Sequence, residues 1–212
     1  MKLSMIDRSW SGMLITFCGL DGCGKTTQIS KLKEHFENLG ITSVLTKQPT
    51  DSVRNSEIFR TFMDCENNEE YEYRALSLLA ASDRVQHSNK VILPILKDGQ
   101  VVISDRYFYS CLANLRARGY TNDQWIYEIA KSIPKPDIAF FLDVPVDVAI
   151  NRVRLRPSEK DRYIDIELQY KLKQEYINIA KENGGILLSS DMNEEECFEL
   201  IKQNISKVMQ NV

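Results

Sequence analysis

The sequence predicts an α/β protein whose single sheet has five parallel strands and helices on both faces. Short apolar segments rich in β-branched residues alternate along the chain with longer segments in which apolar residues recur at helical spacing. Glycine or proline residues mark many of the boundaries between them. Strands joined through helices lie parallel with right-handed crossovers, so helices cover both faces of the sheet.

The expected strands are residues 14–18, 41–46, 101–103, 137–142 and 186–188. The first of them is an apolar run that stops at Gly19, as buried strands often do. The expected helices are residues 25–39, 69–89, 94–98, 145–156, 164–182 and 194–209. Gly40 and Gly184 are expected to end two of these helices, because glycine readily adopts the left-handed conformation of a helix end. Ligands of such sheets bind beyond the carboxyl ends of the strands.

Length and composition indicate one compact unit. The chain has 212 residues, 43% of them hydrophobic, and we expect a single domain over residues 1–212. The formal net charge of −3 argues against a nucleic-acid-binding protein, and the apolar runs are too short to cross a membrane. The five cysteines form no C-x-x-C pair, which favours free thiols and a cytoplasmic location.

The segment Gly19-Leu-Asp-Gly-Cys-Gly-Lys-Thr26 matches the phosphate-binding pattern G-x-x-x-x-G-K-[ST] in full. It follows an expected strand and opens an expected helix, which makes a chance match the weaker interpretation and predicts a three-layer P-loop fold. We expect Lys25 to face solvent and act on the β- and γ-phosphates, and the Thr26 hydroxyl to ligate Mg²⁺. The residues expected to bind ATP in this segment are Gly19, Gly22, Gly24, Lys25, Thr26 and Thr27.

Two further groups of charged residues favour phosphate chemistry over an ordinary charged surface. Asp105 and Arg106 follow the third expected strand, where an acidic side chain can hold a water of the Mg²⁺ ion. Residues 152–163 are rich in arginine and lysine, and we expect them to form a small basic lid that closes over the triphosphate. Arg152 is expected to bind ATP, and Arg156 is placed one helical turn after it.

With these motifs in place, the chain resembles the thymidylate kinase family from residue 14 to about residue 180. The resemblance is carried by residues 17–28 around the phosphate-binding motif, by Asp105-Arg-Tyr-Phe-Tyr-Ser110 and by Leu142-Asp-Val-Pro145. Residues 78–86 and the pair Asp161-Arg162 also contribute to it. The element DR[YHF]-x-x-S after a strand separates this family from P-loop proteins in general.

The resemblance implies roles for particular side chains. Asp21 is similar to the family's acidic residue at the sugar of the acceptor, and Arg84 to the arginine that binds the thymine edge. Arg106 is similar to the arginine that binds the acceptor phosphate and reaches toward the donor, so it is expected to be catalytic together with Lys25. Because Gly22 replaces an arginine that some members carry in the loop, the catalytic arginine is expected in the lid, as Arg156 or alternatively Lys160.

The acceptor side departs from the family pattern. Ala80 stands where an aromatic side chain usually stacks on thymine, and Leu115 stands where a polar side chain reads the base. We therefore expect open volume at Ala80 and a less selective pocket. The side chains that could fill this volume are Tyr71, Tyr73, Tyr107 and Tyr109, and Tyr107 is counted among the acceptor-binding residues.

The sequence thus predicts a kinase that uses ATP and Mg²⁺ to phosphorylate a nucleoside monophosphate, most simply dTMP to dTDP. The resemblance also implies a homodimer. A kinase specialised for another nucleotide or nucleotide-like metabolite is the first alternative, favoured by Ala80 and Leu115. A regulatory nucleotide hydrolase without a small acceptor is the second alternative, and the acceptor-side residue Asp21 speaks against it.

Overall fold

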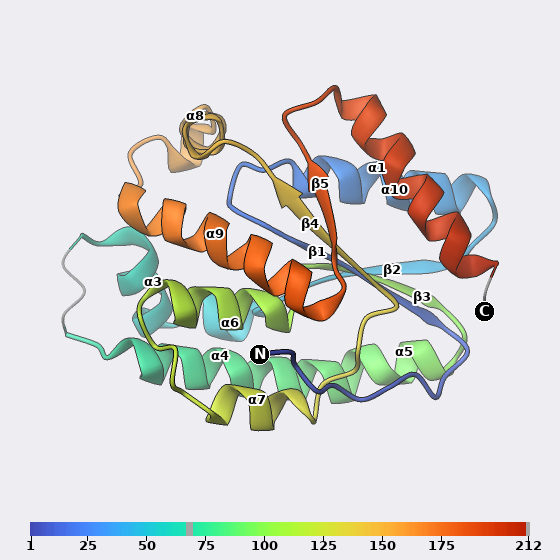
Figure 1. Ribbon diagram of the computed structural model, residues 1–212, viewed down its shortest axis with the longest axis horizontal. Coiled ribbons are helices and arrows are strands. Elements are labelled where there is room, and N and C mark those ends of the chain that lie inside the picture. The colour runs from blue at the N-terminus through green and yellow to red at the C-terminus, as the bar shows by residue number, and fades with distance from the viewer. Residues whose placement is uncertain (67–69, 211–212) are drawn as a thin grey trace.

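The computed structural model describes residues 1–66 and 70–210. Its centre is one parallel sheet with the strand order β2-β3-β1-β4-β5, which confirms the predicted α/β fold with five strands (Figure 1). The strands are β1 (Met13–Cys18), β2 (Ser43–Lys47), β3 (Val101–Asp105), β4 (Ile138–Asp143) and β5 (Ile186–Ser189). Strands β1 and β3 are neighbours and run parallel, so the loops that follow them lie side by side at the carboxyl ends of the strands.

Helices form a layer on each face of this sheet. They are α1 (Lys25–Asn38), α2 (Asp51–Arg54), α3 (Glu57–Asp64), α4 (Tyr73–His87), α5 (Leu93–Lys97), α6 (Phe108–Ala117), α7 (Trp125–Ala130), α8 (Val146–Arg154), α9 (Ile166–Asn183) and α10 (Glu194–Met209). Helices α1 and α10 pack together on one face, whereas α4, α6 and α9 pack together on the other (Figure 1). No helix in the described part of the chain is long and apolar enough to cross a membrane.

The central strand β1 is buried along its whole length. Leu14, Ile15 and Phe17 are completely inaccessible to solvent, and the Phe17 ring stacks on Phe140 of β4 with centroids 5.1 Å apart. Burying a side chain of this size contributes about 1.5–3 kcal/mol. The loop that follows β1 is therefore attached to one of the best-packed parts of the protein.

Several helices differ from the sequence-based expectation. The helices α2, α3, α6 and α7 were not predicted, and the expected helix start at Glu69 lies outside the described residues. The basic helix α8 ends at Arg154, so the expectation that it carries Arg156 is wrong. Pro157 explains this, because the residue before a proline is driven out of the helical region, and Arg156 has the extended backbone angles φ −82° and ψ 122°.

Candidate active site

A large cleft opens beyond the carboxyl ends of β1 and β3. Its volume is about 1990 Å³, roughly twice the upper end of the range usual for one small ligand. The loop after β1 lines one part of it, the lid segment and α9 close one side, and α3 and α4 line the other end. The cleft therefore has room for two ligands side by side.

The phosphate-binding loop has a backbone that only glycine can follow at its centre. Gly22 has φ +82°, and a Cβ atom there would lie 2.2 Å from the carbonyl oxygen of Ala149. Gly24 caps the start of α1 with φ 90°, so the loop turns directly into the helix. The first backbone N–H groups of a helix, together with its dipole, favour an anion at this point. Thr26 and Thr27 are exposed and line the cleft.

Lys25 lies differently from the sequence-based expectation. Its side chain lines the cleft but is only 6% exposed, and Nζ donates hydrogen bonds to the carbonyl oxygens of Gly19 at 3.1 Å and Leu20 at 2.6 Å. Lys25 is thus held inside the loop rather than facing solvent. The carbonyl contacts keep the ammonium group in the loop, where a bound phosphate would meet it.

Asp105, at the end of β3, is placed where a carboxylate could bind a metal ion or one of its waters. It lines the cleft beside the loop, and its Oδ1 is buried without a hydrogen-bond partner among the described residues. Its Oδ2 lies 3.5 Å from Nζ of Lys47. An unpartnered buried oxygen is costly, so it indicates that a further ligand belongs here. Hydroxyl and carboxylate oxygens, as in Thr26 and Asp105, are the ligand atoms that Mg²⁺ prefers.

Asp21 joins the phosphate-binding loop to the lid. One carboxylate oxygen accepts a hydrogen bond from Arg106 at 2.5 Å, and the other accepts one from Arg162 at 3.0 Å. Burial alone would raise the pKa of Asp21, but the charges of Arg106, Lys25 and Arg162 outweigh burial and hold the pKa well below its usual range. Asp21 is therefore ionised at neutral pH.

Arg106 is fixed in an unusual conformation. It has φ +66°, in the left-handed region, and its backbone N–H donates to the Phe17 carbonyl at 2.8 Å. Its guanidinium also donates to the carbonyl oxygen of Gly19 at 3.1 Å and to the hydroxyl of Tyr176 at 2.9 Å. A non-glycine residue in this region costs about 1–3 kcal/mol, a cost found mainly at functional sites. The guanidinium is thus preorganised between the loop and α9.

The two candidates for the catalytic residue of the lid, Arg156 and Lys160, differ in whether they line the cleft. Arg156 lines the cleft and its guanidinium lies 3.3 Å from Glu159, whereas Lys160 is exposed and does not line the cleft. Arg152 lines the cleft as expected and donates to the carbonyl oxygen of Ser190 at 3.4 Å. The structure therefore favours Arg156 over Lys160.

Arg84 and Ala80 lie at the far end of the cleft, but two of the expected acceptor residues, Tyr107 and Leu115, do not line it. Arg84 is 3% exposed, its NH1 donates to the Ala80 carbonyl at 2.8 Å, and its Nε has no partner among the described residues. Tyr107 is fully buried outside the cleft and donates to the carbonyl of Pro134 at 2.7 Å. Leu115 is also fully buried and does not line the cleft. The structure thus does not bring Tyr107 and Leu115 to the site.

Two residues of the site were missed in the sequence. Arg162 belongs to the basic segment and to the family motif Asp161-Arg162, which could have singled it out as the partner of Asp21. Tyr176 reads as an ordinary core residue of a long helix, yet its hydroxyl accepts from Arg106 and donates to Ser110 Oγ at 3.1 Å. No feature of a single sequence distinguishes such a tyrosine from a packing residue.

Comparisons with known proteins agree with this geometry. The family model described as "Thymidylate kinase" matches residues 17–201. The chain is 41% identical over 172 residues to a "Probable thymidylate kinase" of Pyrococcus horikoshii, covering 80% of this chain and 83% of the relative. It is 33% identical over 198 residues to "Probable thymidylate kinase 1" of Saccharolobus solfataricus, covering 91% and 98%. A "Thymidylate kinase" of Sulfurihydrogenibium sp. is 30% identical over 203 residues, with 92% and 98% covered. The family match spans both the phosphate-binding loop and the lid, and the chain belongs to the thymidylate kinase family.

Proposed function

We propose that this protein transfers the γ-phosphoryl group of ATP to dTMP, giving ADP and dTDP. One observation carries the proposal beyond family membership. The same cleft contains the phosphate-binding loop at one end and, at the other, the buried guanidinium of Arg84, whose Nε has no hydrogen-bond partner among the described residues; Arg106 also lines this cleft. A nucleotide hydrolase has no use for the second end, whereas a transferase needs it for an acceptor.

The reaction follows from the placement of the charges. In the proposed complex ATP binds with its phosphates on the loop and near Lys25, and dTMP binds with its base toward Arg84 and its phosphate toward Arg106; all three side chains line the cleft. An oxygen of the dTMP phosphate forms a bond to the γ-phosphorus, and the bond from that phosphorus to the β,γ-bridging oxygen breaks, so that the electron pair leaves with ADP. The acceptor oxygen needs little activation, so positioning and charge neutralisation by Lys25, Arg106 and the lid supply the catalysis.

The residues beside the loop fit a Mg²⁺ ion that arrives with ATP. Thr26 and Asp105 would hold it, Thr26 through its exposed hydroxyl and Asp105 through its unpartnered Oδ1. The ion supplies neutralisation of phosphate charge when it is bound. Lys25 and Arg106 contribute the remaining positive charge from the protein side.

A nucleotide panel tests the proposed reaction. We expect ATP consumption to depend on a nucleoside monophosphate, with dTMP giving the highest kcat/KM among dTMP, dUMP, dCMP and dGMP. Equal ATP consumption with and without any acceptor would instead support the regulatory hydrolase. A clear preference for another monophosphate would support the specialised kinase, which is the alternative that Ala80 favours.

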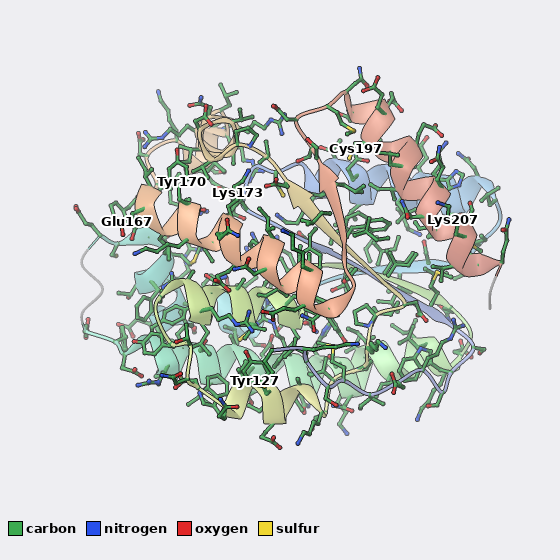
Figure 2. The ribbon with its side chains drawn as sticks, viewed as in Figure 1. Tyr127, Glu167, Tyr170, Lys173, Cys197 and Lys207 are labelled. Atoms are coloured by element: carbon green, nitrogen blue, oxygen red, sulfur yellow. The ribbon has the colours of Figure 1, made fainter. Side chains whose placement is uncertain are left out.

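Exchanging Asp105 for asparagine is expected to raise the Mg²⁺ concentration for half-maximal rate by about 10–100-fold. A neutral amide holds a metal-bound water less well than a carboxylate does. Asp143→Asn is the matched control, because Asp143 also ends a strand and pairs with a lysine, Lys173 on α9 (Figure 2), but does not line the cleft. An unchanged Mg²⁺ dependence in Asp105→Asn would remove Asp105 from the metal side.

Removing the lid arginine in Arg156→Ala is expected to lower kcat and kcat/KM together by about 10², the lower end of the usual effect of one preorganised donor. The effect stays at that end because Arg152 and Arg162 remain in the cleft. Arg154→Ala is the control, since Arg154 lies on α8 but does not line the cleft. A rise in acceptor KM with unchanged kcat would make Arg156 a ground-state binding residue, and Lys160→Ala would then be measured.

The remaining features of the proposal concern the whole molecule. We propose a single domain, as the length and composition indicate, a cytoplasmic location, as the cysteine pattern favours, and a homodimer, as the resemblance implies. Three exposed apolar side chains on and just after α4 support an association surface along this helix: Leu78, Leu79 and Val91. Sedimentation at several protein concentrations measures the oligomeric state.

A further inference from the structure

The segment from residue 50 to residue 62 runs antiparallel to α4. At one end the backbone N–H and the hydroxyl of Thr50 donate to the carboxylate of Asp83, at 2.8 Å and 2.5 Å. At the other end the ring of Phe62 meets the ring of Tyr73 edge-on, with centroids 5.2 Å apart. Residues between Thr50 and Phe62 therefore lie against the part of α4 between Asp83 and Tyr73.

Phe59, one helical turn before Phe62, occupies the middle of this contact. It packs against the small apolar cluster formed by Val53, Leu76 and Ala80. The guanidinium of Arg54 lies 5.8 Å from the centre of its ring. Ala80 is the smallest member of this cluster, and its short side chain leaves room for a ring from α3 beside α4. The ring of Phe59 on α3 therefore takes up part of the open volume that was expected at Ala80.

The ring of Phe59 is half-buried and lines the cleft. On α4, Arg84 follows Ala80 by one helical turn, and its unpartnered Nε is buried in the same end of the cleft. An aromatic face next to a buried hydrogen-bond donor suits a planar heterocycle that carries acceptor atoms on its edge. A pyrimidine or purine base has this chemistry.

Other aromatic side chains are placed less well for this role. Tyr107 and Tyr109 are buried and do not line the cleft. Tyr73 lines the cleft, but its ring is covered by the guanidinium of Arg118, 4.0 Å from the ring centre. Tyr73 also precedes Ala80 by two turns of α4, about 10 Å along the helix axis. Tyr71 precedes Tyr73 and lies farther still along the chain.

We propose that Phe59 of α3 is the aromatic side chain on which the base of the acceptor packs, and that Ala80 provides the clearance for it. The inference rests on the proposed function, since it takes the acceptor to be a nucleoside monophosphate. It makes α3 a specificity-determining element of the cleft. Arg84 then reads the edge of the base from α4, while Phe59 binds its face.

Phe59→Leu tests the proposal directly. Loss of the ring is expected to raise the KM for dTMP about tenfold and leave the KM for ATP unchanged, because base stacking on an aromatic ring commonly contributes that much or more. Tyr170→Leu is the control, since Tyr170 is an exposed aromatic side chain of α9 outside the cleft (Figure 2). An unchanged KM for dTMP in a folded, active Phe59→Leu variant overturns the proposal.

Moving the ring from α3 to α4 provides a second test. Ala80→Phe alone is expected to crowd Phe59 and raise the KM for dTMP, whereas Ala80→Phe combined with Phe59→Ala is expected to restore most of the wild-type value. A double variant no better than the two single effects combined overturns the proposal. Calorimetric titration of dTMP without ATP separates this result from the proposed function. Tighter binding to wild type than to Phe59→Leu supports the pocket even if no phosphoryl transfer occurs, and equal binding counts against it.

Discussion

Exchanging Lys25 for methionine is expected to lower kcat by a factor on the order of 10³. The ammonium group of Lys25 is held at the carbonyl oxygens of Gly19 and Leu20, inside the loop that wraps the phosphates. A charge fixed in advance at the place where negative charge develops needs no reorganisation during the reaction, so its loss falls mainly on the transition state. Steady-state rates at saturating ATP and dTMP measure the effect.

Methionine is the suitable replacement because Lys25 is almost completely buried. It keeps the length and the apolar stem, so the loop loses the charge without gaining a cavity. Lys131→Met serves as the control, since Lys131 pairs with Glu128 on the surface and does not line the cleft. Circular dichroism should show a folded protein for both variants. A folded Lys25→Met protein with wild-type turnover would contradict the assignment of the donor site.

The three central strands of the sheet, β1, β3 and β4, could be predicted because they are short, apolar and buried on both faces. β1 is buried at every position, and its signal survives without any knowledge of its neighbours. Helix α6 could not be predicted for the opposite reason. Eight of the residues from Phe108 to Ala117 are buried, so the helix lacks the one-sided apolar stripe that marks an amphipathic helix.

The two ends of the cleft differ in the same way. The donor end is built from consecutive residues, Gly19 to Thr26, whose glycines and lysine form a phosphate-binding pattern that can be recognised in the sequence. The acceptor end depends on contacts between distant segments. Arg106 binds Tyr176 across 70 residues, and Phe59 reaches the cluster around Ala80 from another helix. Such pairings follow from tertiary packing, and no local pattern encodes them.

In the lid, a proline ends the helix earlier than the spacing of the arginines predicts. The spacing of Arg152 and Arg156 suggested one helical face, but Pro157 turns the chain before that face is complete. Arg156 still lines the cleft, because the chain continues as a short 3₁₀ turn, Pro157–Glu159, and returns to Asp21 through Arg162. The closing contact of the lid is therefore an ion pair with the phosphate-binding loop.

Exchanging Arg106 for asparagine is expected to lower kcat/KM for dTMP on the order of 10³-fold. The guanidinium of Arg106 is held by Asp21, by the carbonyl of Gly19 and by Tyr176, so its position is fixed before a substrate binds. Burial would lower the pKa of Arg106, but the oxygens of Tyr176 and Asp21 outweigh it and raise the pKa. The group is thus a permanent positive charge between donor and acceptor.

Asparagine separates this function from the fold. Next to glycine, it is among the residues that adopt a positive φ most readily, so Arg106→Asn keeps the backbone of φ +66° at little cost. Asp21 keeps Arg162 as an ion-pair partner, and the lid contact remains. Arg74→Asn is the control, because Arg74 is half-exposed and pairs with Asp123 outside the cleft. Thermal unfolding should show a cooperative transition for both variants.

Arg106→Lys adds the decisive comparison: lysine keeps the charge but cannot donate to three partners in a fixed fork. If position and not charge alone governs the rate, Arg106→Lys stays far below wild type. Activity near wild type in Arg106→Asn would show that the phosphate of the acceptor is bound elsewhere.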